Sequence, residues 1–162
     1  MKALENSTNI DEIYVATDCE AIKSIVDQFK FSKVLVFERS NENAQDKSTT
    51  ESVMLEFLSK QKFNDDDIFL LVQATSPLTK TEDFDAAIGQ YHKENTDSLL
   101  SCVRTKRFFW KGNSQSINYD YKNRPRRQDF EGLLMENGAF YISTVGGIIT
   151  CLLYTSPSPR DS

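Results

Sequence analysis

Short apolar runs alternate along the chain with segments whose apolar residues recur every three or four positions. The runs 13–17, 34–37, 68–72, 98–103 and 139–142 each have the length of one strand. Helical spacing predicts helices over 19–30 and 81–94, and a further helix that begins near 48–51. The run 68–72 is apolar at every position, as a strand is when both of its faces are covered. Strands that alternate with helices predict an α/β fold with a mostly parallel sheet and helices on both faces.

Polar residues that directly follow the predicted strands are the first candidates for a site, because ligands of open α/β sheets bind beyond the carboxyl ends of the strands. Asp18 follows the first strand, and we expect it to cap the next helix rather than to bind a ligand hydroxyl. Arg39 follows the second strand. The segment 48–51 has the spacing of a capping box, and the free N–H groups of such a helix start favour an anion such as a phosphate.

The central apolar run leads into Gln73-Ala74-Thr75-Ser76. An amide and two hydroxyls at the end of a buried strand suit the recognition of hydroxyl and carboxylate groups. The same residues also suit a loop in which Thr and Ser cap the backbone before Pro77. The pattern leaves both interpretations open.

The chain carries a net charge of −5 and a pI near 5.0, which argues against a general nucleic-acid binder. Against this acidic background, segment 122–129 reads KNRPRRQD and holds four basic residues within 122–127. Guanidinium forks match phosphate and carboxylate oxygens, so we favour a small anionic ligand. The alternative is a non-catalytic module that docks an acidic partner or nucleic acid through this run.

The remaining residues with chemically active or apolar side chains give weaker indications of a functional site. Cys19, Cys102 and Cys151 have no metal-ligand or disulfide spacing, and we expect no metal site among the residues present. The longest nearly apolar run, 145–154, is too short to cross a bilayer, and the N-terminus lacks a signal-peptide pattern. We therefore expect a cytoplasmic protein with no membrane partner. His92 and the acidic run 65–67 are interpreted as solvated, and the run 108–110, FFW, as packing or interface.

Taken together, the stretches IYVATD, ERS with DKSTT, LLVQATSPL, RPRRQD and ENGAFYI resemble the acylneuraminate cytidylyltransferases, also called CMP-sialic acid synthetases. The resemblance runs from about residue 10 to 149 and implies a three-layer Rossmann-like nucleotidyltransferase fold, truncated at both ends. It implies that Arg126 is catalytic and that the nucleotide-binding residues are Arg39, Ser48 and Thr50. The implied sugar-binding residues are Gln73, Thr75, Ser76, Lys111, Arg124, Arg127, Gln128, Asn137 and Tyr141.

The family reaction implied by this resemblance joins CMP from CTP to the anomeric hydroxyl of an acidic nine-carbon sugar, and it releases pyrophosphate. The resemblance also implies Mg²⁺, with ligands outside this sequence, and a homodimer in which the segment after residue 98 crosses the interface. A related cytidylyltransferase for legionaminate, pseudaminate or 3-deoxyoctulosonate remains an alternative. No nucleic acid is expected as a partner.

The ends of the sequence differ from the family pattern. A first strand and a Gly/Arg/Lys-rich nucleotide loop would precede Met1 in the family, so we expect residues 1–150 to be a partial cytidylyltransferase domain that is inactive alone. Residues 151–162 shift abruptly to Ser/Pro-rich sequence that resembles translated sequencing adapter. We expect this segment to be a non-native tail.

Overall fold

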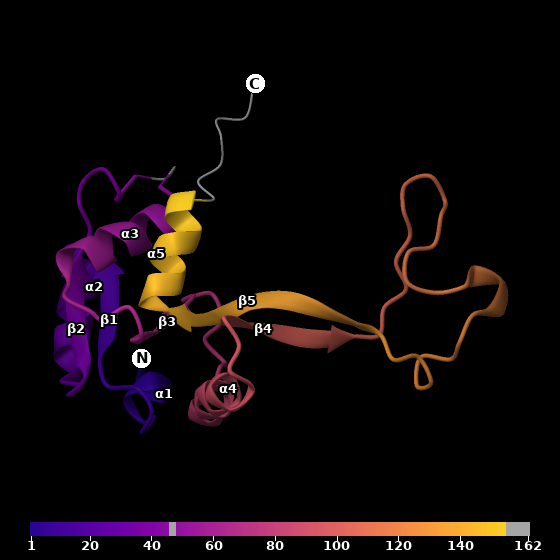
Figure 1. Cartoon of the computed structure of the whole chain (residues 1–162), viewed down its shortest axis with the longest axis horizontal. Coiled ribbons are helices and arrows are strands. Elements are labelled where there is room, and N and C mark those ends of the chain that lie inside the picture. The colour runs from indigo at the N-terminus through magenta and orange to yellow at the C-terminus, as the bar shows by residue number, and fades with distance from the viewer. Residues whose placement is uncertain (46–47, 155–162) are drawn as a thin grey trace.

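The computed structural model describes residues 1–45 and 48–154. Figure 1 shows an α/β body from which a long two-stranded ribbon projects. In chain order the elements are α1 (Lys2–Glu5), β1 (Ile13–Thr17), α2 (Glu20–Phe29), β2 (Val34–Glu38), α3 (Thr50–Lys60), β3 (Ile68–Val72), α4 (Thr81–Glu94), β4 (Ser98–Thr105), the 3₁₀ turn η1 (Tyr121–Asn123), β5 (Leu133–Thr144) and α5 (Val145–Tyr154). The α/β class and each predicted strand and helix are confirmed.

The strands form two sheets. β1 pairs with β2 in parallel, with Ile13 opposite Val34, and α2 makes the crossover between them. β5 lies between β3 and β4 and runs antiparallel to both. β3 and β4 therefore run in the same direction as each other, and β5 is the antiparallel member that the mostly parallel expectation did not include.

Two apolar clusters cover opposite sides of β3, which gives the three layers predicted. On one side, α4 buries Phe84 against Phe140 and Ile142, with Ile68, Leu70 and Val72 packed against them. On the other side, Phe57 of α3 and Val145 of α5 form a second cluster that includes Phe69. Alternate residues of one strand thus face different helices, which explains why 68–72 is apolar throughout.

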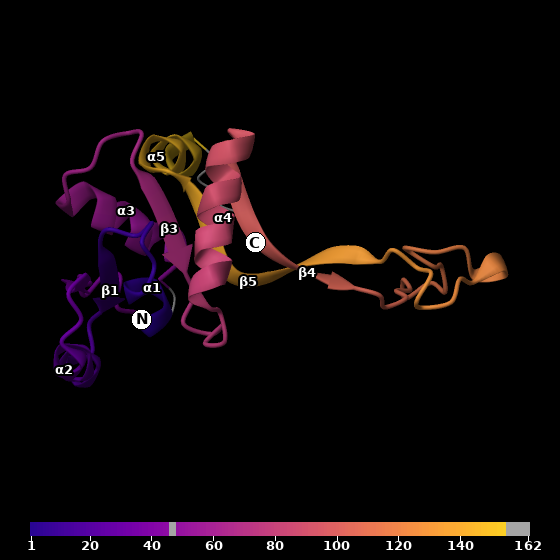
Figure 2. The ribbon, with the colours of Figure 1, turned by 90° about the horizontal axis from the view of Figure 1, so that it is seen from below.

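The ribbon, which we call the arm, consists of residues 102–136. Its paired part joins 102–105 to 133–136, and its distal loop spans 106–132. Figures 1 and 2 both show it leading away from the helices. Within the distal loop Phe108 packs on Tyr119 and Phe130, with ring centroids 4.4 and 5.0 Å apart. Large apolar side chains of the arm nevertheless stay 37–63% exposed: Val103, Phe109, Trp110, Ile117, Tyr121, Leu133, Leu134 and Met135.

Two helix starts differ from the sequence predictions. The prediction that Asp18 caps α2 is wrong, because the N-cap is Cys19 and has no side-chain cap hydrogen bond. The start of α3 lies one residue later than the capping-box spacing suggested. Thr49 is its N-cap and accepts a hydrogen bond from the Ser52 backbone N–H at 3.2 Å.

The helix α5 was not predicted. Its first amides are held by the acidic loop before β3, since Val145 N–H donates to the Asp67 carbonyl and Gly146 N–H to the Asp65 carbonyl, each at 2.9 Å. The helix continues to residue 154, into the segment expected to be a tail, and 155–162 lie outside the described residues. Within the described ranges, no helix is long and apolar enough to span a membrane.

Candidate functional site

The residues predicted for the site, together with Asp18, fall into three groups according to the elements that carry them. The arginine group comprises Arg39, Asp18, Ser48 and Thr50, which follow β1 and β2 or begin α3. The glutamine group comprises Gln73, Thr75, Ser76, Asn137 and Tyr141, around the end of β3. The arm group comprises the predicted residues of the distal loop: Lys111, Arg124, Arg126, Arg127 and Gln128.

In the arginine group, the ends of β1 and β2 are tied together by an ion pair. The Arg39 guanidinium donates through Nη2 to Asp18 Oδ1, and its backbone N–H donates to the Thr17 carbonyl at 3.4 Å. The Arg39 hydrogen bond lowers the pKa of the Asp18 carboxyl below its ordinary value. The Nε of Arg39 is buried and has no hydrogen-bond partner among the described residues, so one donor of this guanidinium remains to be satisfied.

The loop between β2 and α3 is held by Glu56, a residue that the sequence analysis did not single out. Its carboxylate accepts hydrogen bonds from the Ser40 backbone N–H at 2.9 Å and from Asn43 Nδ2 at 2.7 Å, and it pairs with Lys60. The Lys60 and Asn43 hydrogen bonds lower its pKa to about 2. The i,i+4 spacing of Glu56 and Lys60 was the available signal, but the contacts to the loop could not be inferred from it.

The two hydroxyl residues near the start of α3 face different surroundings. The Ser48 Oγ donates to the Glu42 carbonyl at 2.9 Å and lines a small hollow beside Asn43. Thr50, in the first turn of α3, lines a much larger groove of about 1140 Å³. The structure therefore does not bring Ser48 and Thr50 into one cavity. Asp46 and Lys47, which belong to the matching DKSTT stretch, lie outside the described residues.

In the glutamine group, three residues converge where β3 meets β5. The Gln73 backbone N–H donates to the Ala139 carbonyl at 3.1 Å, which extends the ladder past the end of β3. A Cβ placed on Gly138 would lie 3.5 Å from Gln73 Oε1 and 3.8 Å from the Tyr141 hydroxyl, and Gly138 has φ +66°. The Gln73 amide and the Tyr141 phenol thus both lie beside the bare backbone of Gly138.

Tyr141 has a further partner. Its hydroxyl donates to Glu136 Oε1, and this hydrogen bond raises the pKa of the phenol above its ordinary value. The phenol therefore remains a neutral donor and acceptor at physiological pH. Glu136 was not predicted as part of the site, although it stands five residues before Tyr141 on the same strand.

The other members of this group are engaged differently. Thr75 is exposed in the turn after β3, and Ser76 N–H donates to the Gln73 carbonyl at 3.3 Å. The Oδ1 of Asn137 accepts from Ser101 Oγ at 2.6 Å and from the Ala139 backbone N–H at 3.2 Å. These bonds lie at the β-bulge between Leu100 and Cys102. Asn137 therefore has a structural role at the base of the arm.

The arm group lies away from the other two. The Arg124 guanidinium stacks 4.6 Å above the Phe108 ring, and Lys111 N–H closes the hairpin tip by donating to the Gln115 carbonyl at 2.8 Å. Arg126 and Arg127 are exposed, and within the described chain neither guanidinium forms an ion pair. Figures 1 and 2 place the distal loop at the far end of the ribbon from β3. One copy of the chain does not bring Arg126 to Gln73.

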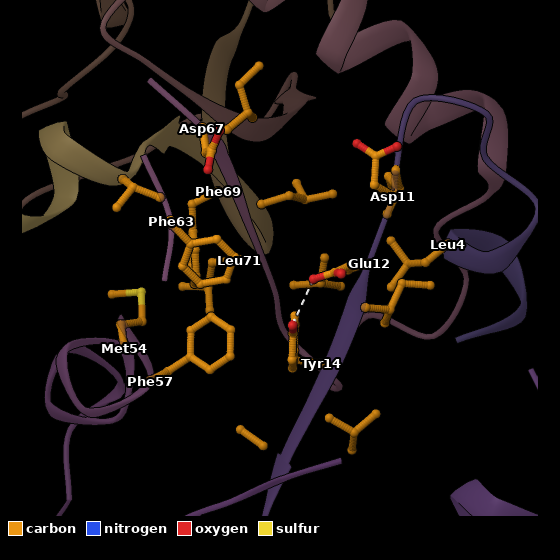
Figure 3. A pocket seen from close by; sticks show the side chains of 18 of the residues that line it. Leu4, Asp11, Glu12, Tyr14, Met54, Phe57, Phe63, Asp67, Phe69 and Leu71 are labelled. Atoms are coloured by element: carbon orange, nitrogen blue, oxygen red, sulfur yellow. Dashed lines mark hydrogen bonds between the residues drawn. The ribbon is translucent and has the colours of Figure 1, made fainter. Parts of the chain in front are cut away.

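The arginine and glutamine groups share one edge of the body. Figure 3 shows the chain descending from Asp11 to Tyr14 into β1 and from Asp67 to Leu71 along β3, so the two strands run in the same direction. Their carboxyl ends carry Asp18 and Gln73, respectively. This is the edge at which ligands bind in open α/β sheets, so the placement supports a ligand site there.

Metal ligands do not gather in the same way. Across residues 1–45 and 48–154, no three His, Cys, Asp or Glu side chains cluster as they would around a metal ion. The donor set of the described chain therefore does not fit a Mg²⁺ site, and no step in the proposed chemistry is derived through the ion.

Comparison with known proteins adds to this geometry. A family model described as cytidylyltransferase matches residues 1–139. An N-acylneuraminate cytidylyltransferase from Oncorhynchus mykiss is 35% identical over 152 residues, which cover 89% of this chain and 34% of the relative. The chain spans about a third of the length of the curated relatives it matches.

Two solved structures share the fold. A 4-diphosphocytidyl-2C-methyl-D-erythritol synthase from Anaerococcus prevotii superposes with a TM-score of 0.66 over 99% of this chain and 65% of its own. A CMP:2-keto-3-deoxy-manno-octonic acid synthetase complexed with CTP gives a TM-score of 0.64 over 98% and 66%. Both are 14% identical in sequence, so the likeness concerns the fold alone.

Proposed function

Because the chain belongs to the cytidylyltransferase family, we propose that the protein transfers CMP from CTP to the anomeric hydroxyl of a sialic-acid-like sugar. In this reaction the sugar oxygen forms a bond to the α-phosphorus, the bond from that phosphorus to the pyrophosphate oxygen breaks, and pyrophosphate leaves. The observation that supports the proposal is that β1 and β3 run in the same direction and that β2 is parallel to β1. Arg39 after β2 and Gln73 after β3 therefore follow strand ends on one edge of the body, in a chain whose curated relatives are named N-acylneuraminate cytidylyltransferases.

Each group has a distinct part in this chemistry. Arg39 and the amides at the start of α3, beside Thr50, attract the nucleotide phosphates through their positive potential. The Gln73 amide offers both donors and an acceptor to the sugar, and the Tyr141 phenol, whose proton goes to Glu136, offers an acceptor. Positioning and the neutralisation of developing charge account for most of the rate enhancement in phosphoryl-type transfer. The arginines of segment 124–127 can neutralise the developing charge.

The remote position of the arm leads us to propose a homodimer in which the arm of one copy reaches the site of the other. The arm presents exposed aliphatic and aromatic side chains, including Trp110 and Leu134 at 48% and 63% exposure. Such a patch marks an interaction surface. In the dimer Lys111, Arg124, Arg126, Arg127 and Gln128 would approach the partner's glutamine group. Mg²⁺, which we expect to be required, would have to be held by residues outside the described chain.

A second acidic sugar is the competing substrate. One of the two solved structures is a synthetase for CMP-2-keto-3-deoxy-manno-octonic acid, whose substrate has the same carboxylate and anomeric hydroxyl. The sequence relatives favour the sialic-acid type at 35% identity against 14% for that structure.

The decisive experiment measures pyrophosphate release by the full-length protein with CTP and either sialic acid or 3-deoxyoctulosonate. Arg126→Ala should lower kcat by about 10²–10³, as the loss of one transition-state donor does. Arg126→Lys should rescue little, because an ammonium cannot replace a bidentate fork. Arg107→Ala is the matched control in the same loop and should leave kcat unchanged. Equal activity of Arg126→Ala and Arg107→Ala would contradict the catalytic assignment.

Mixing two variants that are each impaired at a limiting sugar concentration tests the cross-subunit site. A heterodimer of Arg126→Ala and Gln73→Ala chains has one site with both residues intact if the arm acts across the interface. The mixture should then regain about a quarter of wild-type activity, given random exchange in a twofold dimer. If each site is built within one chain, mixing should restore nothing.

A further inference from the structure

An irregular stretch of β5 places Glu136 beside Tyr141. In a regular strand, residues separated by an odd number of positions point to opposite faces of the sheet. Here, however, Leu100 of β4 pairs with Tyr141 and Cys102 pairs with Glu136, so the extra residues of the irregularity lie in β5. Leu100 and Cys102 share a face of β4 because they are two residues apart, and their partners therefore share it as well. This arrangement lets the Tyr141 hydroxyl donate to the Glu136 carboxylate.

The same stretch opens the backbone beside the end of β3. Gly138 lies within it at φ +66°, a conformation that favours glycine. Gln73 Oε1 and the Tyr141 hydroxyl both border the space that a Cβ on Gly138 would fill. The hydrogen bonds that the described chain makes to Gln73 involve its backbone N–H and carbonyl. The Gln73 side-chain amide and the Tyr141 oxygen are therefore both placed to bind one ligand.

Glu136 decides what the phenol can offer to such a ligand. A tyrosine hydroxyl has one proton to donate and lone pairs that accept. The proton of Tyr141 is directed to Glu136, and the same hydrogen bond raises the pKa of the phenol, so the proton is retained at physiological pH. Within the described ranges Glu136 forms no ion pair, and its side chain is exposed. A negative charge without a cationic partner thus lies next to the phenol.

We propose that Glu136 is a positioning residue for the sugar, an inference that rests on the proposed transfer of CMP to an acidic sugar. By taking the phenol proton, Glu136 leaves the Tyr141 oxygen able to accept and unable to donate. The sugar group that binds this oxygen is therefore a hydroxyl or an amide N–H. The sugar carboxylate offers acceptors alone, and it would also meet the charge of Glu136. It therefore lies on the side of the sugar away from Glu136, while Tyr141 and Gln73 select the uncharged side.

The first measurement follows the proton without the reaction. The Tyr141 ring is observed by NMR in the full-length protein labelled with isotope-enriched tyrosine, and Tyr141→Phe assigns its resonance. Glu136→Gln keeps the shape of the side chain and removes its charge, so the pKa of Tyr141 should fall toward its ordinary value of 10.0. Glu131→Gln, another exposed carboxylate of the arm, is the matched control and should leave this pKa unchanged. Equal pKa values in wild type and Glu136→Gln would overturn the proposal.

The second measurement separates positioning from folding, through the kinetics of pyrophosphate release. Glu136→Ala and Tyr141→Phe should each raise the KM for the sugar by about 2–12-fold, the equivalent of one neutral hydrogen bond. The KM for CTP and the Tm should stay nearly unchanged. Because the two residues act through one contact, the double variant should be no worse than Tyr141→Phe alone. Effects on the sugar KM that multiply in the double variant would contradict a shared contact.

The third measurement identifies the bound group with sialic acid analogues that each lack one hydroxyl or the acylamide N–H. In the wild type, the analogue that lacks the group facing Tyr141 should have a kcat/KM lower than the parent sugar by about 2–12-fold. Tyr141→Phe should abolish that difference for this analogue alone. If every analogue loses as much in Tyr141→Phe as in the wild type, the phenol binds no sugar donor and the proposal is wrong.

The outcomes distinguish this inference from the proposed function. A full-length wild-type protein that transfers CMP to no acidic sugar would refute the proposed function, whatever the titration of Tyr141 shows. Normal transfer combined with multiplying KM effects would refute the role of Glu136 alone.

Discussion

Asn137→Ala separates a structural role of this residue from the sugar contact implied by the family resemblance. The substitution removes the Oδ1 that accepts from Ser101 Oγ and from the Ala139 N–H. Ala139 is 5% exposed, so its amide would lose its partner in a largely buried position. Two hydrogen bonds at about 0.5–1.5 kcal/mol each give a loss of about 1–3 kcal/mol. In a chain of this size, that loss lowers the Tm by about 2–12 °C.

The assay is thermal unfolding followed by circular dichroism, together with urea unfolding to obtain the free energy directly. Asn137→Asp retains an acceptor at the same place and should keep most of the stability. Asn113→Ala, at the exposed tip of the arm, controls for the loss of a surface amide. A Tm of Asn137→Ala within about 1 °C of wild type would refute the bulge argument. If the KM for the sugar rose at the same time, the residue would be a ligand contact instead.

Two further predictions concern the loop after β2 and the base of the distal loop. The pKa of Glu56 is lowered from 4.5 to about 2, so its contribution to stability is complete above pH 4.5 and is lost as the pH falls toward 2. Glu56→Gln should therefore lower the Tm at pH 7, and the difference in Tm from wild type should vanish near pH 2. Glu51→Gln on the same helix is the control. A difference in Tm that does not change with pH would contradict the argument. Gly132→Ala should cost more than about 1 kcal/mol in urea unfolding, because φ is +82° and the new Cβ would lie 2.3 Å from the Thr105 carbonyl oxygen. Gly112→Ala, with open space around it, should change little, and equal effects of the two would show that the turn at Gly132 carries no strain.

The elements of the body could be predicted because local pattern and final packing agree there. The run 68–72 became β3 and the helical spacing over 81–94 became α4, each with the predicted bounds. The apolar face of α4 is buried as its period required, with Phe84 2% exposed. Such agreement is expected where each apolar position meets a neighbour in the core.

The arm and α5 could not be predicted, for physical reasons. The apolar run 139–142 marks the buried part of β5, while 133–138 lie in the exposed ribbon and hold Glu136-Asn137-Gly138, which favour a turn by composition. The alternation of apolar and polar positions in a strand does not reveal its direction relative to its neighbours, so the antiparallel direction of β5 could not be predicted. α5 begins with Val145-Gly146-Gly147, a poor helix start by propensity. Its amides are held by carbonyls of the loop before β3, nearly eighty residues earlier in the chain.

The sequence predicts individual candidate residues but not how they are arranged in space. The rule that polar residues follow strands brought Arg39 and Gln73 to the same edge of the body. Arg126 lies in the cationic run that predicted an anionic ligand, and the family resemblance implied its catalytic role. Neither shows how far the arm holds this residue from the body. Glu56 and Glu136 were missed because their partners are backbone or neighbouring side chains, which no charge pattern reveals.

The central place of β5 in its sheet sets the order in which the protein can assemble. Val72 of β3 pairs with Phe140 of β5, a separation of 140 − 72 = 68 residues, and β4 pairs with the same strand. During synthesis β3 and β4 therefore emerge well before the strand that joins them, and the cost of closing so long a loop is met late. Until residue 144 has left the ribosome, IFLLV is an unpaired apolar segment. A chaperone that binds extended apolar peptides would find its target there, and its release would coincide with the arrival of β5.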